Sequence, residues 1–99
     1  MSHHGIEFDS QQIADFCRRH GIVRLSLFGS ILRRDFGPNS DIDVLIEFPG
    51  STPSLLELGG MQQELSGILG REVDLKTWGF LSESIRRCVE NERLIQYAA

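Results

Sequence analysis

The sequence contains little that would place it outside the ordinary globular proteins. It has only two cysteines, Cys17 and Cys88, without a CxxC spacing, so a disulfide framework or a thiolate metal site is disfavoured. Both fall on apolar faces of predicted helices, where we expect buried free thiols. No apolar run reaches the roughly 18 residues that span a membrane, and no secretory signal is visible. We therefore expect a cytoplasmic protein with no membrane partner.

Positive charge is also scarce. The chain has 10 Lys and Arg residues against 14 Asp and Glu residues, which gives a net charge of −4. This balance disfavours general nucleic-acid binding, which depends on basic side chains that neutralise phosphates. A length of 99 residues, with 40% hydrophobic and 24% charged residues, is typical of one globular domain. We expect a single domain over residues 1–99, with a flexible polar start over residues 1–8.

Helical and strand patterns alternate along the chain. Helices are predicted at residues 10–20, 30–34, 54–69 and 81–97, and strands at residues 22–28, 41–48 and 71–77. Asp9 or Ser10 can cap the first helix, and Ser54 with Glu57 can form a capping box on the third. This order predicts an α/β protein with a small mixed sheet of three to four strands and helices packed mainly on one face.

Two of the predicted helices have features that bear on packing. The last one places five side chains on an inward face: Leu81, Ile85, Cys88, Val89 and Ile95. In the third, Gly59 and Gly60 each weaken the helix by about 1 kcal/mol relative to alanine. We interpret this glycine pair as a site of close packing or a kink, and not as a nucleotide-binding loop.

Two aspartates at the start of the second strand are the first candidates for chemistry. Asp41 and Asp43 point to the same face, because strand side chains alternate, and their Cα atoms should lie roughly 6.5 Å apart. At an effective dielectric of about 20, two charges at that spacing repel by roughly 2.5 kcal/mol. A cation between them removes this cost, so the pair indicates a divalent metal site.

A third carboxylate completes the acidic pattern. Asp74 lies on the polar face of the third predicted strand, between the apolar residues Val73 and Leu75. If the two Asp-bearing strands are neighbours, Asp41, Asp43 and Asp74 share one surface, where they can hold one or two Mg²⁺ ions. Two such ions can stabilise both the attacking and the leaving oxygen of phosphoryl transfer.

The Gly29-Ser30 turn after the first strand can hold phosphate. Each motif also has a simpler interpretation, because Gly-Ser turns are common and an Asp-x-Asp pair can be a solvated strand edge. The combination is more specific. It consists of a strand, Gly29-Ser30, a short helix with Arg33, the segment Ser40-Asp41-Ile42-Asp43, a helix, and a strand that carries Asp74. A purely structural α/β module would leave the three same-face aspartates unexplained.

With these motifs the chain resembles the minimal nucleotidyltransferases (MNT) of the DNA polymerase beta superfamily. The resemblance covers residues 22–77 closely and, by architecture, nearly the whole chain. It implies a palm-like fold and a reaction in which an acceptor hydroxyl attacks the α phosphate of ATP and pyrophosphate leaves. By this resemblance, Asp41 and Asp43 bind both Mg²⁺ ions, while Asp74 completes one metal site and helps to deprotonate the acceptor.

The resemblance also implies nucleotide contacts. Gly29 and Ser30 would hold the β and γ phosphates, and Ser40 belongs to the same nucleotide-binding signature. Arg33 can either neutralise the triphosphate or brace the loop. Arg34 departs from the family pattern, which often has glycine after this arginine. It can add a phosphate contact or narrow the access to the site.

Size and family together indicate the partner. There is no room here for the modules with which template polymerases, tRNA-tailing enzymes and antibiotic-modifying enzymes hold their acceptors. We therefore expect a partner protein, or a second copy of the chain, to complete the acceptor site. Similar MNT proteins are typically paired with a helical HEPN toxin, which implies an antitoxin that transfers AMP from ATP to a tyrosine of the toxin. The alternative is an antitoxin that neutralises its partner by binding alone, with a vestigial or regulatory nucleotide site.

Overall fold

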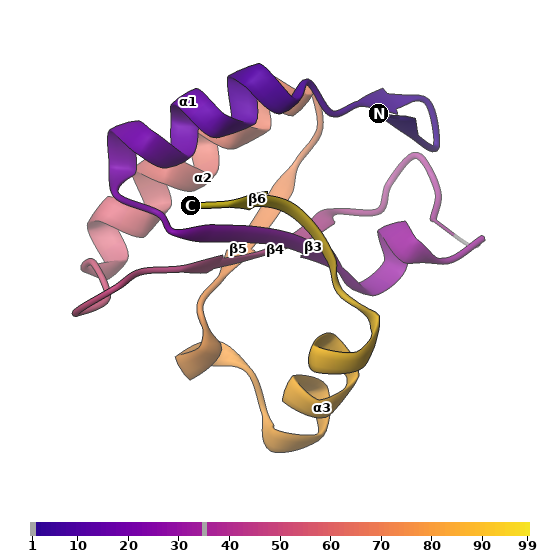
Figure 1. Cartoon of the computed structure of the whole chain (residues 1–99). Coiled ribbons are helices and arrows are strands. Elements are labelled where there is room, and N and C mark those ends of the chain that lie inside the picture. Colours follow the sequence, from indigo (N-terminus) through magenta and orange to yellow (C-terminus); the bar gives the residue numbers. More distant parts are fainter. Residues whose placement is uncertain (1, 35) are drawn as a thin grey trace.

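The computed structural model describes residues 2–34 and 36–99. The larger of its two sheets contains β3 (Arg24–Phe28), β4 (Ile42–Glu47), β5 (Val73–Lys76) and β6 (Leu94–Ala98), in the order β5-β4-β3-β6. β3 is antiparallel to both β4 and β6, whereas β4 and β5 are parallel (Figure 1). The predicted small mixed sheet is therefore confirmed.

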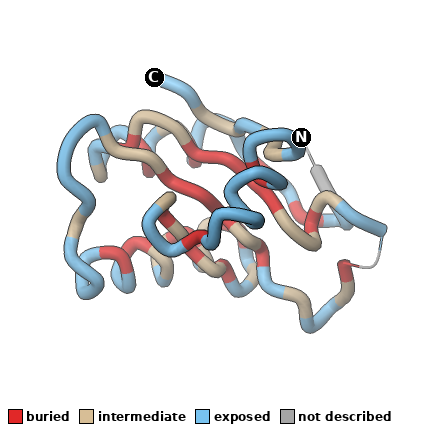
Figure 2. Tube along the Cα trace, turned by 90° about the horizontal axis from the view of Figure 1, so that it is seen from below, coloured by how far each residue is buried: buried red, intermediate tan, exposed pale blue. Residues whose placement is uncertain are grey.

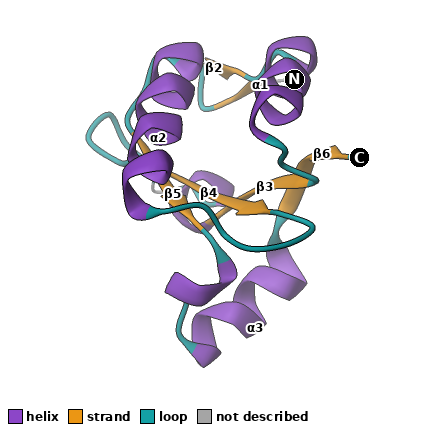
Figure 3. Cartoon of the chain, turned by 90° about the vertical axis from the view of Figure 1, so that its left-hand side faces the viewer, coloured by secondary structure: helices purple, strands orange, loops and turns teal. Residues whose placement is uncertain are grey.

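The α-helices of the described residues lie on both faces of this sheet. α1 (Ser10–His20) and α2 (Leu55–Leu69) cover one face, and α3 (Glu83–Glu92) lies across the other (Figures 1 and 3). Short 3-10 helices follow β3 at Gly29–Leu32 and β5 at Trp78–Phe80. Within the described part of the chain, no helix combines the length and the apolar character that crossing a bilayer requires.

The limits of α1 and α2 follow capping residues that the sequence contains. The Asp9 carboxylate accepts backbone N–H groups at the start of α1, and Gly21 ends this helix with a φ of 71°. The Ser54 hydroxyl accepts the Glu57 backbone N–H at 3.2 Å, and Gly70 ends α2 with a φ of 70°. These two helices therefore begin and end close to where the capping pattern predicts.

The main core lies between the sheet and the α1–α2 layer. Among the described residues it contains nineteen buried side chains, which come from both helices, from the strands β3, β4 and β5, from the N-terminal segment and from connecting segments. The buried stretches follow the central strands in Figure 2. Ile42, Val44 and Ile46 of β4 all belong to this cluster, as the alternation in this strand predicts.

A smaller cluster lies on the opposite face, beneath α3. Phe28 of β3 and Leu45 of β4 pack there with Leu81 and Val89, and Trp78 lies at the margin. Because this apolar cluster is small, the rest of the face remains available for polar groups.

The C-terminal segment differs from the prediction of one helix over residues 81–97, which is wrong. α3 ends at Glu92, and β6 begins at Leu94. β6 pairs with β3, which would otherwise leave a row of backbone N–H and C=O groups unpaired at the sheet edge. This long-range pairing outweighs the local helical pattern. Ile95, predicted to point inward, is 45% exposed as a result.

The glycine pair of α2 does not mark close packing. A Cβ added to Gly59 or Gly60 would meet nothing within 4 Å, so both residues face open space. The helix runs without interruption from Leu55 to Leu69. The interpretation as a close contact is therefore wrong, and the pair only lowers the helix propensity of an exposed stretch.

The N-terminal segment contains elements that the sequence did not indicate. Where a flexible start is expected, β1 (Ser2–His3) and β2 (Ile6–Glu7) form a short antiparallel hairpin. Ile6 and Phe8 are buried in the main core, and Nε2 of His4 lies 3.0 Å from the carbonyl oxygen of Ile31. Met1 lies outside the described residues.

Candidate active site

The Gly29-Ser30 turn lies where β3 ends, directly against β4. Gly29 has a φ of +75°, in the left-handed region that side chains rarely adopt. A Cβ on Gly29 would also collide with Oδ2 of Asp43 and would lie 3.1 Å from Cγ of the same carboxyl. Glycine is required here both by the backbone conformation and by this close approach. The turn and the carboxylate therefore form one local structure.

The two Asp-bearing strands are neighbours, which is the condition for the aspartates to share one surface. Asp43 of β4 and Asp74 of β5 are register partners in the parallel pair. On the other side of β4, Asp43 lies opposite Phe28 of β3. Asp41 precedes β4 by one residue and is exposed. Asp74, Asp43 and Phe28 therefore form a row across three strands, on the face that α3 partly covers.

The Asp43 carboxyl lies in an electrostatically unfavourable position. Burial raises its pKa, and the negative charges of Asp74 and Asp41 raise it further. Lys76 and a hydrogen bond from the backbone N–H of Ser30 act in the opposite direction, but the net shift of the pKa is upward. Because its neighbours disfavour the ionised form, a cation bound beside Asp43 would be stabilised.

Lys76 lies on the same polar face of β5 as Asp74, and no sequence motif indicated a role for it. Its Nζ is 3.3 Å from Oδ1 of Asp74. Among residues 2–34 and 36–99, no three His, Cys, Asp or Glu side chains are grouped closely enough to hold a metal ion. The structure therefore brings Asp43 and Asp74 side by side and pairs Asp74 with a lysine, without a compact cluster of three carboxylates.

Arg71 holds the loop that precedes Asp41. Its Nη2 donates to the carbonyl oxygens of Gly37 and Ser40, each at 2.8 Å, and its guanidinium lies 4.8 Å from the centre of the Phe36 ring. The contacts fix the residue immediately before Asp41. They join residues more than thirty positions apart, and no local pattern in the sequence indicates them.

Ser40 and the two arginines have distinct surroundings. The Ser40 hydroxyl accepts the backbone N–H of Gly37 at 3.0 Å and so braces the loop, while its role as a nucleotide ligand stays a prediction. Arg33 is exposed and lines a cavity beside the turn. Arg34 is exposed and is not among the residues that line this cavity.

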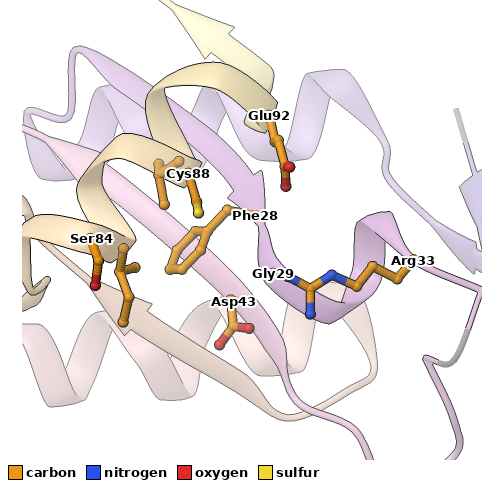
Figure 4. Close-up of a pocket in the computed structure, with 9 residues that line it drawn as sticks. Phe28, Gly29, Arg33, Asp43, Ser84, Cys88 and Glu92 are labelled. Carbon is orange, nitrogen blue, oxygen red and sulfur yellow. The ribbon is translucent and has the colours of Figure 1, made fainter.

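This cavity has a volume of about 320 Å³ and lies between the turn and α3 (Figure 4). Phe28, Gly29, Arg33 and Asp43 line it from the sheet side. Five residues of α3 line it from the other side: Ser84, Ile85, Cys88, Val89 and Glu92. In Figure 4 the Cys88 thiol and the Glu92 carboxylate extend from α3 toward the cavity. Its volume falls within the range of small-ligand sites, roughly 300–1,000 Å³.

Two predictions about the burial of side chains on α3 are wrong. Cys88 and Ile85 are expected on a buried helix face, but Cys88 is exposed and Ile85 is 46% exposed. α3 covers only part of the sheet, so its apolar stripe is divided between the small cluster and the cavity. Cys17, in contrast, is buried as predicted, and burial raises its pKa to about 12.

The sheet is mixed, the Gly-Ser turn lies at the end of β3, and Asp43 and Asp74 lie on the neighbouring strands β4 and β5. This arrangement defines the class of nucleotidyl-transfer domains. Comparison with known proteins agrees: residues 10–96 match the nucleotidyltransferase domain family, and the chain belongs to this family. The resemblance indicated by the sequence motifs is therefore confirmed.

Individual proteins of known sequence or structure are also similar to the chain. One relative is the Methanocaldococcus jannaschii protein MJ0435, which is named as a protein adenylyltransferase. It is 38% identical to this chain over 82 residues, which cover 83% of this chain and 87% of that protein. A solved toxin–antitoxin structure with AMP-PNP matches with a TM-score of 0.76 at 21% identity, over 93% of this chain and 75% of that chain.

A further structural match is a complex of an MNT antitoxin with the tri-AMPylated HEPN toxin of Shewanella oneidensis. Its TM-score is 0.68 at 21% identity, over 91% of this chain and 70% of that chain. At this level of identity, the two structural matches show a shared fold.

Proposed function

We propose that this chain is a protein adenylyltransferase that transfers AMP from ATP to a tyrosine hydroxyl of a HEPN-type partner and thereby acts as an antitoxin. The observation that carries the proposal is the placement of Asp43 beside Asp74 and in direct contact with the Gly29-Ser30 turn. The name of the M. jannaschii relative supports adenylyl transfer, and the fold shared with the HEPN-bound antitoxin supports the partner.

Asp41, Asp43 and Asp74 would hold Mg²⁺, as two ions by the family resemblance, and phosphate oxygens of the donor would complete a coordination that these carboxylates alone are not grouped closely enough to supply. Carboxylate oxygens are the hard ligands that this cation prefers, and the raised pKa of Asp43 marks a position where bound positive charge is favourable. When bound, the metal would neutralise phosphate charge and activate the acceptor hydroxyl. Because ATP and Mg²⁺ are both supplied in the cytoplasm, the proposal places the reaction there.

The residues of the chain would orient the donor and receive the proton. Because the Ser30 backbone N–H donates to Asp43, the Ser30 hydroxyl and Arg33 are the groups that would contact the β and γ phosphates. The acceptor oxygen forms a bond to the α phosphorus and releases its proton toward Asp74. The bond between the α phosphorus and the bridging oxygen breaks, and pyrophosphate leaves with that oxygen and its electron pair.

The surface beside Asp74 supports a protein as the acceptor. A second hollow, of about 230 Å³, is lined there by Asp74, Lys76, Phe80 and the start of α2. Two large apolar side chains that line it are exposed, Leu55 by 71% and Phe80 by 50%. Exposed apolar groups that gather beside a polar site are typical of protein–protein contact surfaces. The HEPN partner would dock on this side, whereas a homo-oligomer stays a prediction.

The second candidate is an antitoxin that neutralises its partner by binding alone. The pairing of Asp74 with Lys76 favours it, as does the lack of a compact three-carboxylate group among the described residues. Under this reading, the turn and the carboxylates would be a vestigial or regulatory nucleotide site.

Neutralisation of the partner in cells separates the two candidates. The partner would be expressed with the wild-type chain, with Asp43→Asn, or with Glu90→Gln, an exposed residue of α3 outside the cavity. Adenylyl transfer predicts that Asp43→Asn loses protection while its complex with the partner still forms, and that Glu90→Gln protects fully. Full protection by Asp43→Asn would overturn the transferase role and establish neutralisation by binding.

A further inference from the structure

α3 presents a single stripe of side chains to the cavity. The five lining residues, from Ser84 to Glu92, follow the spacing of one helix face. Of its three apolar members, only Val89 is buried, at 2% exposure. Ile85 is 46% exposed and Cys88 is exposed, so the helix directs apolar surface toward the cavity and not into a core.

The two ends of the cavity differ in chemistry. Gly29, Arg33 and Asp43 form a polar end that contains the positive charge suited to phosphate. Ile85 and Cys88 form an apolar side with the ring of Phe28, which lies between the Cys88 thiol and the Asp43 carboxylate in Figure 4. A ligand that fits both ends must carry an anionic part and a flat or apolar part.

A polar network holds α3 in a fixed position over the sheet. The Trp78 indole Nε1 donates to Oε1 of Glu47 at 2.9 Å, and Nη1 of Arg93 donates to Oε2 of the same residue at 3.2 Å. Nε of Arg86 donates to the Trp78 carbonyl oxygen at 3.1 Å. Glu47 belongs to β4, the strand that carries Asp43, so the α3 wall and the carboxylate share one framework.

We propose that Ile85 and Cys88 form the wall that binds the nucleobase of the donor nucleotide, with its triphosphate at the Gly29–Arg33 end. This assignment rests on the proposed nucleotidyl transfer and adds the base-binding residues to it. The π face of a base packs favourably on apolar and aromatic side chains, whereas phosphates need cations or N–H donors. The polarity of the cavity therefore sets the direction in which the nucleotide lies.

Cys88 provides a direct probe of this wall. Cys17 will not compete for a thiol reagent, because it is 0% exposed and burial raises its pKa to about 12. The full chain with Mg²⁺ would be alkylated with iodoacetamide, and the modified residue would be identified by peptide mass spectrometry. The ligands would be α,β-methylene-ATP, which cannot release pyrophosphate, and inorganic tripolyphosphate, which has no base.

The expected result is protection by the base-bearing ligand alone. At a hundredfold excess over its Kd, α,β-methylene-ATP should slow the alkylation of Cys88 about 100-fold, in proportion to the remaining free protein. Saturating tripolyphosphate should leave the rate unchanged. Equal protection by tripolyphosphate would overturn the assignment, since phosphate would then occupy the α3 side.

A matched pair of truncations tests the wall independently of the thiol. Ile85→Ala should weaken the binding of α,β-methylene-ATP about tenfold, because part of the apolar contact with the base is lost, and should leave tripolyphosphate binding unchanged. Ile95→Ala makes the same truncation at an isoleucine that is 45% exposed and lies outside the cavity, so it should change neither affinity.

The remaining outcomes separate this inference from the function on which it rests. AMP transfer to the partner without protection of Cys88 would overturn the base wall and leave the adenylyltransferase proposal standing. Absence of both nucleotide binding and AMP transfer would overturn the two together.

Discussion

The two faces of the central sheet are built for different purposes. The face beneath α1 and α2 belongs to a cluster of nineteen buried residues, whereas the α3 face has a cluster of four. The residues that flank α3 also make polar contacts with β4, in which Glu47 accepts from Trp78 and Arg93. Since buried apolar area stabilises the fold by about 25 cal/mol per Å², most of the stability comes from the first face. The second face can therefore hold clustered charges and an open cavity.

A single strand shows this division most clearly. Ile42, Val44 and Ile46 of β4 enter the large cluster. The alternate positions carry Asp43 beside the turn and Leu45 in the small cluster. The alternation of side chains in β4 thus separates the stabilising residues from the chemical ones within six residues.

The largest expected effect comes from equal truncations on the two faces. Leu27 and Leu45 are both 0% exposed, but Leu27 lies in the large cluster and Leu45 in the small one. Leu27→Ala should cost about 4–5 kcal/mol and Leu45→Ala about 2–3 kcal/mol of unfolding free energy, because the thinner cluster can collapse around the cavity more easily. Urea denaturation measures both. A larger cost for Leu45→Ala would contradict the division between the faces.

The next effect tests the contact between the turn and the carboxylate. Gly29 and Gly21 both have positive φ, +75° and +71°, but only a Cβ at Gly29 would meet Asp43. Gly21→Ala should cost about 1–2 kcal/mol, the usual cost of a left-handed residue with a Cβ. Gly29→Ala should cost more and should abolish AMP transfer, because Asp43 must move. Thermal unfolding of the two variants gives the comparison, and equal losses would argue against close approach.

Arg71 should have a smaller but measurable effect. Arg71→Gln removes the guanidinium that holds the Gly37 and Ser40 carbonyls at 2.8 Å, and we expect a loss of about 1.5–3 kcal/mol, the range for hydrogen bonds to charged groups. It should also raise the Mg²⁺ concentration that gives half-maximal AMP transfer, because the loop that positions Asp41 is released. Arg18→Gln, which breaks an exposed pair with Asp15, is the control and should change neither quantity. An unchanged Mg²⁺ titration in Arg71→Gln would limit this arginine to a stabilising role.

The smallest effect is a gain of stability. Folding raises the pKa of Asp43, so its ionised form destabilises the native state at every pH above the pKa of the unfolded chain. In EDTA at neutral pH, Asp43→Asn should raise Tm by no more than about 4 °C, since 1 kcal/mol shifts Tm by roughly 4–8 °C and solvent screens part of the repulsion.

This gain should shrink as the pH falls, because protonation of Asp43 in the wild-type chain removes the same charge. Below the ordinary pKa of the carboxyl the two proteins should be equally stable. Scanning calorimetry from neutral to acidic pH tests this, and a Tm difference that grows on acidification would contradict the assigned cause.

The features that could be predicted from the sequence are those that depend on a local pattern of residues. The capped helix Ser10–His20 and the alternation of β4 appear as expected, because caps and periodicity act within a few residues. The strand pattern also placed the aspartates on the polar faces of two strands, and the structure shows that these strands are neighbours. These features define the acidic part of the candidate site.

The remaining features depend on distant parts of the chain. β6 replaces the end of a predicted helix because it pairs with β3, and Arg71 contacts a loop more than thirty residues away. The spacing of apolar residues in α3 predicts a buried helix face. Ile85 and Cys88 line the cavity instead, because α3 overlies only part of the sheet. Helical spacing identifies such a stripe without showing what it contacts.

The central claim is that the α3 face is a site of adenylyl transfer. The most direct measurement is intact-protein mass spectrometry of the HEPN-type partner after incubation with this chain, ATP and Mg²⁺. We predict a mass gain equal to AMP, which is lost with Asp43→Asn and kept with Glu90→Gln. A tight complex with no mass gain on the partner would contradict the claim and would leave neutralisation by binding as the function.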